Sequence, residues 1–103
     1  MYLQLIMRFE WDDRKCRKNI DKHGVDFADG VQMFSSLMLV KSDCRKSYGE
    51  PRHIGMGFIQ GRVMVMVYTE REGNVIRIIS LRKANKREQT KFKKAIQDRL
   101  GTR

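Results

Sequence analysis

The chain has 103 residues, 41% of them hydrophobic and 33% charged, and 22 lysines and arginines against 12 acidic residues give a net charge of +10. This length predicts one domain with one modest core, and no apolar run approaches the roughly 20 residues of a membrane-spanning helix. The charge indicates an anionic partner, but it does not separate nucleic acid from an anionic membrane or an acidic protein.

The first stretch predicts a strand. Residues 3–10 alternate weakly between apolar and polar side chains. The opening residues are apolar but lack the basic segment and the small-residue cleavage site of a signal peptide, so we expect a cytoplasmic protein. Cys16 and Cys44 do not have the spacing of metal ligands, and in that compartment both should stay reduced.

Two helices should follow this strand. Asp12 or Asp13 is a suitable N-cap for a basic helix that runs to about Lys22 and ends at Gly24. A second short helix is expected over residues 26–34. Its apolar residues recur at helical spacing: Phe27, Val31 and Phe34.

Two strands come next, separated by a polar loop. The first is expected over Leu37–Val40 and the second over Arg52–Ile59. Gly55 and Gly57 would lie on one face of the second strand. Glycine inside a strand is typical of a bulge or of close approach by another segment.

A β-hairpin is expected over residues 62–84, and we place it at the centre of the sheet. Its first strand is apolar on both faces, as in a strand with neighbours on each side. The alternation runs Val63, Val65 and Val67 against Met64, Met66 and Tyr68. Gly73 and Asn74 favour the turn because both tolerate positive φ. The chain then resumes as a β-branched strand from Val75 to Ser80.

Arg77 interrupts this second apolar strand. A guanidinium group in such a place is costly unless its surroundings are polar, wet or anionic. One interpretation is a buried ion pair with Glu70 or Glu88. The other is an arginine that faces phosphate on an open side of the sheet.

The last helix should run from Lys86 to Leu100, with Asn85 as its N-cap and Glu88 completing a capping box. The predicted order is strand, helix, helix, four strands, helix, with short turns that favour a mainly antiparallel sheet. We expect an α+β fold with the helices packed on one face and a basic groove on the other.

Ordered motifs along the chain resemble those of the BrnT family of toxins. They begin with Phe9-Glu10-Trp11-Asp12 and continue with Lys15, Asn19, Lys22-His23-Gly24-Val25, Phe27, Val31, Phe34, Gly49-Glu50, Arg52, Ile54-Gly55, Tyr68-Thr69-Glu70-Arg71, Arg77-Ile78-Ile79-Ser80, Arg82-Lys83-Ala84 and Glu88. The resemblance covers nearly the whole chain from Phe9 to Phe92, with the motifs in the family's order, which makes the set specific although each motif alone is weak.

The resemblance implies a ribonuclease toxin of a type II toxin–antitoxin module, with a fold similar to that of the RelE toxins. It implies RNA cleavage that inhibits translation and growth, with no cofactor. It also implies a cognate BrnA-like antitoxin with a ribbon-helix-helix domain. The two proteins would form a 2:2 heterotetramer that binds its operator DNA.

Metal-independent RNA cleavage needs a base for the 2′-hydroxyl, positive charge for the phosphorane and an acid for the 5′-oxygen. The planar fork of arginine suits the second task. Histidine exchanges protons near neutral pH, although His23 also fits a plain helix C-terminus. The candidate catalytic residues are Arg77, Arg71, Arg82 and His23, and the candidate RNA-binding residues are Lys22, Arg52 and Lys83.

One feature opposes this grouping, because strict alternation puts Arg77 and Arg82 on opposite faces of their strand. A bulge or the end of the strand would have to bring them together. Two other function classes fit the charge: a basic nucleic-acid-binding module without catalysis, and a structural protein whose basic face meets an acidic partner.

Overall fold

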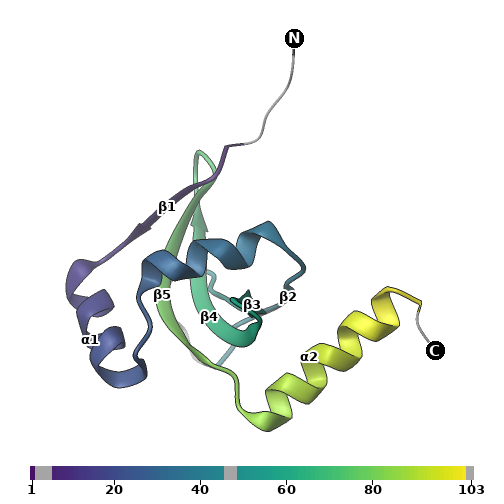
Figure 1. The fold of residues 1–103 in the computed structure, drawn as a ribbon. Coiled ribbons are helices and arrows are strands. Elements are labelled where there is room, and N and C mark those ends of the chain that lie inside the picture. The colour runs from purple at the N-terminus through teal and green to yellow at the C-terminus, as the bar shows by residue number, and fades with distance from the viewer. Residues whose placement is uncertain (2–5, 46–48, 102–103) are drawn as a thin grey trace.

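A five-stranded sheet lies at the centre of the computed structural model, which describes residue 1, residues 6–45 and residues 49–101. The strand order is β1-β5-β4-β3-β2; β1 runs parallel to β5, and the other neighbours are antiparallel. The fold is therefore α+β with a mainly antiparallel sheet (Figure 1). The elements in chain order are β1 (Arg8–Trp11), α1 (Asp13–His23), the 3-10 helix η1 (Phe27–Ser35), β2 (Leu39–Ser42), β3 (His53–Ile59), β4 (Arg62–Arg71), β5 (Val75–Lys83) and α2 (Lys86–Arg99).

β4 is the central strand, as its two apolar faces predict. Residues 63–69 are all buried, and the strand pairs with β3 on one side and β5 on the other. The hairpin turn into β5 has positive φ at Gly73 and Asn74. Met64 and Met66 face one half of the core, and Val63 and Val65 face the other.

The helices pack on both faces of the sheet, so the prediction of a single helical face is wrong. α1 and η1 cover the face of Met64 and Met66. α2 lies against the opposite face, where Phe92 is fully buried among β-strand residues and Ile96 packs beside it. Figure 1 shows α2 on the far side of the strands from α1. The apolar spacing of α2 indicates that one of its sides is buried, but not which face of the sheet buries it.

The ends of the predicted helices agree with the structure more closely than the first strand does. Asp12 caps α1 by accepting hydrogen bonds from two backbone N–H groups, and Gly24 ends it in the left-handed conformation. The second helix forms as the 3-10 helix η1. Residues 3–5 of the predicted first strand lie outside the described residues, and β1 begins only at Arg8, where pairing with β5 begins. No helix in the described part of the chain is long and apolar enough to span a membrane.

The glycines of β3 allow a close crossing, as predicted. The segment between η1 and β2 passes over them, and its Met38 fills the space that side chains would need. A Cβ atom on Gly55 would lie 2.5 Å from the Met38 Cε atom, and one on Gly57 would lie 3.2 Å from the Met38 Cγ atom. Met38 therefore belongs to this crossing, and β2 begins after it, at Leu39.

α1 completes the edge of β5 that β1 leaves unpaired. β1 pairs only with the first half of β5, up to Ile78. Beyond that point, the buried side chain of Asn19 donates a hydrogen bond to the Leu81 carbonyl at 2.7 Å and accepts one from the Leu81 N–H at 3.2 Å. The same amide donates to the Val25 carbonyl at 3.0 Å. One side chain thus replaces a missing strand neighbour.

Asn19→Ala should lower the free energy of unfolding by about 2–4 kcal/mol, because it leaves the buried N–H and C=O of Leu81 without partners. Urea unfolding followed by circular dichroism measures this change. Lys18→Ala is the control, since Lys18 is exposed on the same helix and should change stability by less than about 0.5 kcal/mol. Equal stability of the two variants would contradict the role given to Asn19.

Candidate functional site

A bulge in β5 brings Arg77 and Arg82 to the same face of the sheet. The pairing with β4 steps from Ser80 directly to Ile78, so Ile79 is an extra residue in β5. This extra residue reverses the alternation between the two arginines. The obstacle that strict alternation raised against their grouping is therefore absent.

The bulge creates a strip of polar residues on the side of the sheet that α2 only partly covers. Arg77 lies opposite the buried Thr69 in β4, and Arg71 follows Thr69 on the same face. Arg52 directly precedes β3, and alternation with its neighbour His53 directs it to this face as well. We define the arginine face as Arg52, Thr69, Arg71, Arg77 and Arg82.

Glu10 holds Arg77 in place. Its carboxylate accepts a hydrogen bond from the Arg77 Nη1 atom at 2.6 Å, and the side chains of Arg77 and Glu10 are 30% and 42% exposed. The parallel pairing of β1 with β5 sets these two residues side by side. The expected partners, Glu70 and Glu88, were wrong: Glu70 follows Thr69 and points to the other face, and Glu88 binds a different arginine. Arg77 is thus paired but not sealed in the core.

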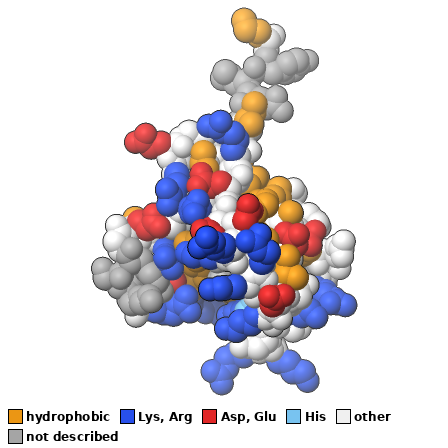
Figure 2. Space-filling view, turned by 90° about the vertical axis from the view of Figure 1, so that its left-hand side faces the viewer, with side chains coloured by type: hydrophobic (Ala, Val, Ile, Leu, Met, Phe, Trp, Pro, Cys, Tyr) orange, Lys and Arg blue, Asp and Glu red, His pale blue; other side chains and the backbone are white. Residues whose placement is uncertain are grey.

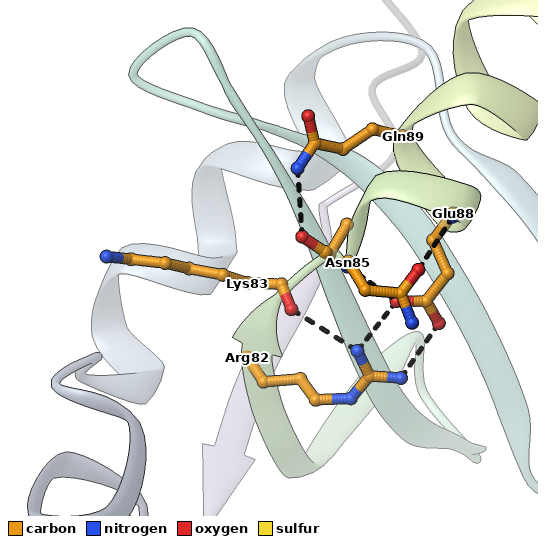
Figure 3. A network of polar contacts seen from close by, with 6 residues as sticks. Arg82, Lys83, Asn85, Glu88 and Gln89 are labelled. Carbon is orange, nitrogen blue, oxygen red and sulfur yellow. Dashed lines mark hydrogen bonds and ion pairs between the residues drawn. The ribbon is translucent and has the colours of Figure 1, made fainter.

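Glu88 binds Arg82 with both carboxylate oxygens (Figure 3). The two distances are 2.8 and 2.9 Å, and Arg82 also donates to the Lys83 carbonyl at 3.2 Å. Glu88 closes the predicted capping box as well, because it accepts from the Asn85 N–H while Asn85 caps the Glu88 N–H. The Arg82 hydrogen bonds lower the pKa of Glu88 to about 2, and the same pair raises the pKa of Arg82.

Arg71 is held more loosely than the other two arginines. Its Nη2 atom lies 3.4 Å from the Glu50 carboxylate, and both side chains are exposed. The described residues thus give each of Arg71, Arg77 and Arg82 a carboxylate partner while 30–46% of each arginine side chain stays exposed. Guanidinium groups fixed in this way are oriented before an anion arrives, which is what stabilisation of developing negative charge requires.

α1 begins close to Arg77 in the arginine face, and His23 lies at the other end of the helix, away from Arg77. The backbone N–H groups of Lys15 and Arg14 hold the pKa of Asp12 below its usual range, and the positive charge of Arg77 adds to this effect. His23 ends the helix, roughly 16 Å further along at 1.5 Å per residue. The described structure has no hydrogen bond or ion pair between His23 and the arginine face.

The remaining candidates do not all share the face. Lys22 is exposed at the end of α1. Lys83 follows Arg82 in β5, and the two side chains point in different directions (Figure 3). His53 packs against Tyr68, with ring centroids 5.3 Å apart, on the face of α1 and η1. Among the candidates, the arginines therefore share one face of the sheet, whereas Lys22 and His23 lie at the far end of α1.

Sequence reasoning missed two members of the site, Glu10 and Thr69. The contact of Glu10 with Arg77 was not predicted, because it depends on the parallel pairing of β1 with β5, which the short turns of the sequence do not indicate. Thr69 lies between the positions of Arg77 and Arg52, with its hydroxyl buried and without a hydrogen-bond partner in the described structure. The available signal was the alternation of β4, which continues through Thr69 to Arg71 and marks a polar end of an apolar face.

The surroundings of the site are basic. Figure 2 shows lysine and arginine side chains gathered across the middle of the surface on the side of β1 and α1, with acidic groups among them. Among the described residues, no three His, Cys, Asp or Glu side chains cluster as metal ligands would. The cationic side chains of the arginine face are Arg52, Arg71, Arg77 and Arg82.

Comparisons with known proteins point to one family. The family model "Ribonuclease toxin, BrnT, of type II toxin-antitoxin system" matches residues 11–88, a segment that contains the whole arginine face. Among solved structures, the chain is similar to the crystal structure of the Brucella abortus ribonuclease toxin BrnT, with 29% identity and a TM-score of 0.61 over 79% of this chain and 100% of that one. No curated protein sequence matches the chain.

The Arg82–Glu88 pair predicts a pH-dependent stability. The folded-state pKa of Glu88 lies below its ordinary value of 4.5, so its contribution is present above about pH 4.5 and is lost as the pH falls towards 2. Glu88→Gln keeps the side-chain length and should cost about 1–2 kcal/mol at pH 7, after allowance for solvent screening of the partly exposed pair. The difference from the wild type should shrink steadily between pH 4.5 and 2 in urea unfolding.

Asp98→Asn is the matched control, because Asp98 is exposed on the same helix and makes no ion pair in the described structure. It removes the same charge and should show no comparable pH dependence. If the loss of unfolding free energy in Glu88→Gln stays constant down to pH 2, the effect comes from the capping geometry and not from the charge.

Proposed function

The chain belongs to the BrnT family of ribonuclease toxins of type II toxin–antitoxin systems, and we propose that it cleaves RNA without a metal ion. The observation that carries this proposal is the arginine face, where ion-paired but accessible arginines share one side of the sheet. In the proposed reaction, the ribose 2′-oxygen attacks the adjacent phosphorus and the bond to the 5′-oxygen breaks. The products are a 2′,3′-cyclic phosphate and a 5′-hydroxyl end.

Arg77 is the proposed centre of transition-state stabilisation. It lies in the middle of the face, and its partner Glu10 leaves part of the guanidinium group accessible. Arg71 and Arg82 would bind further phosphate oxygens from either side. The pentacoordinate phosphorane carries more negative charge on its oxygens than the ground state does, so fixed guanidinium groups favour it selectively.

His23 is the proposed proton carrier, and Lys22, Arg52 and Lys83 are proposed contacts for the RNA backbone. α1 runs from the Arg77 end of the face past Leu81, which brings His23 towards the end that carries Arg82. Because α1 packs on the face opposite the arginines, His23 would reach a phosphate held by Arg82 around the edge of β5. We also propose that the fold is of the RelE type and that the protein acts in the cytoplasm.

Purified protein should cleave RNA in excess EDTA and leave 2′,3′-cyclic or 3′-phosphate ends, which mass spectrometry of the products identifies. Arg77→Ala should lower the rate by about 10²–10³, as loss of one preorganised charge donor typically does. Arg77→Lys should also be poor, because a point charge does not replace the planar fork.

Arg87→Ala is the control for these variants, since Arg87 is exposed on α2 and forms no ion pair in the described structure. It should cleave at the wild-type rate. Activity that is abolished by EDTA and restored by Mg²⁺ would refute the metal-independent mechanism. Wild-type activity in a folded Arg77→Ala variant would place the site elsewhere, and RNA binding without any cleavage would favour a non-catalytic binding module.

The proposed partner is a BrnA-like antitoxin with a ribbon-helix-helix domain. Its charge should complement the +10 chain, because complementary charge speeds encounter and orients docking. We expect it to cover the arginine face or to block access to it. A dimeric antitoxin that binds one toxin per chain gives a two-fold symmetric 2:2 complex that binds operator DNA.

Co-expression with the product of a neighbouring reading frame should restore growth, and light scattering of the purified complex should report the heterotetramer mass. Association should slow as salt rises, since the encounter is steered by charge. Failure to restore growth despite stable expression of both proteins would count against the partner. A tight complex that cleaves RNA at the free rate would refute only the blocking of the arginine face.

A further inference from the structure

A second basic surface lies outside the arginine face, around a hollow beside α2. The hollow has a volume of about 370 Å³ and lies between the β3–β4 turn, the end of β5 and α2. Its lining contains three cationic side chains and no acidic one: Gly61, Arg62, Val63, Lys83, Gln89 and Lys93. Arg62, Lys83 and Lys93 are all exposed, and none forms an ion pair in the described structure.

The floor of this hollow is fixed by the backbone. The Ala84 N–H donates to the Val63 carbonyl at 3.0 Å and so ties the end of β5 to the start of β4. The Gln89 side chain donates to the Ala84 carbonyl at 3.0 Å, which fixes α2 over the same point. At Gly61 a Cβ atom would meet nothing within 4 Å, so the turn leaves the hollow open. Exposed cations without ion pairs in the described structure therefore line a recess whose floor is fixed by backbone hydrogen bonds.

We infer that this hollow binds a phosphate group of the RNA backbone, as a subsite separate from the arginine face. The inference rests on the proposed ribonuclease function and names where the bound strand continues. Lys83 links the two surfaces, because its carbonyl accepts a hydrogen bond from Arg82 and the residue also lines the hollow. Figure 3 shows the side chains of Arg82 and Lys83 pointing in different directions. An RNA strand that crosses the end of β5 would therefore meet Arg82 first and then the hollow that Lys83 lines.

The lining favours RNA over an acidic protein. Protein interfaces have an apolar centre within a polar rim, whereas Val63 is the one hydrophobic residue along this hollow. An apolar recess does exist elsewhere on α2, lined by Leu37, Leu39, Phe92 and Ile96 among others. Three cations without an apolar centre match a phosphate backbone, for which lysine and arginine supply most of the affinity.

The test compares two double variants with equal charge changes. Arg62→Gln/Lys93→Gln removes one arginine and one lysine from the hollow. Arg87→Gln/Lys94→Gln removes the same pair of residue types from exposed positions of α2 that do not line it. Fluorescence anisotropy with a 2′-O-methyl oligoribonucleotide, which keeps the phosphates but lacks the attacking hydroxyl, measures binding by the wild type and both variants over a salt series.

The hollow variant should bind more weakly than the control variant with every RNA sequence, and its slope of log K against log salt should be smaller by about 1. Equal losses in the two variants would overturn the subsite in favour of diffuse attraction. Unchanged RNA affinity together with weakened antitoxin binding would overturn it in favour of a protein partner. If the hollow variant unfolds at lower temperature than the control, Lys93→Gln against Lys94→Gln gives the same comparison.

Cleavage of unmodified RNA by the wild type is measured alongside. Cleavage by the wild type with identical binding by both double variants refutes the subsite alone. No cleavage by the wild type refutes the proposed function, while the binding comparison still decides whether the hollow holds phosphate.

Discussion

The extra residue in β5 lets this strand bury two apolar side chains that a regular strand would place on opposite faces. Ile78 and Leu81 are both almost fully buried on the face covered by α1 and η1. They are three residues apart, so strict alternation would put one of them on the opposite face. The bulge at Ile79 keeps both in the core and, by the same shift, aligns Arg77 with Arg82. Packing of the core and assembly of the arginine face therefore depend on one local irregularity, as is common for bulges next to functional sites.

The carboxylates around the arginine face orient the guanidinium groups more than they stabilise the fold. Ion pairs with exposed partners contribute little to folding, and the side chains of Arg71 and Arg77 are exposed together with their partners to 30–46%. Such pairs do hold the guanidinium planes, and an incoming phosphate can replace the carboxylate with a similar fork geometry. The Arg82 pair differs, because Glu88 also caps α2. Moving Arg82 away from Glu88 would disturb the start of α2, whereas moving Arg77 away from Glu10 would disturb no helix cap.

Much of the local structure follows from the sequence because local chemistry decides it. Asp12, Gly24 and the Asn85 capping box fix the ends of helices within a few residues, and the alternation of β4 identifies a strand with two buried faces. Long-range pairing is different, since nothing local indicates that β1 runs parallel to β5 or on which face α2 packs. The ion pair between Glu10 and Arg77 was missed for this reason, because it exists only through that parallel pairing. Arg77 was singled out from the sequence because a charge inside an apolar strand is unusual wherever the strand lies, and its role in a site stays a prediction.

The position of α2 divides its side of the sheet into two parts with different chemistry. Near the β3–β4 turn, Phe92 and Ile96 seal an apolar half of the core against Met56, Val63 and Val65. Towards the β4–β5 turn, the same face continues uncovered as the arginine face. Because α2 starts at the end of β5, its capping box lies on the boundary, where Glu88 belongs to the helix and binds an arginine of the face. α2 therefore sets where the arginine face ends and, through Glu88, holds Arg82 in position. The packing of the C-terminal helix is thus coupled to the geometry of the arginine face.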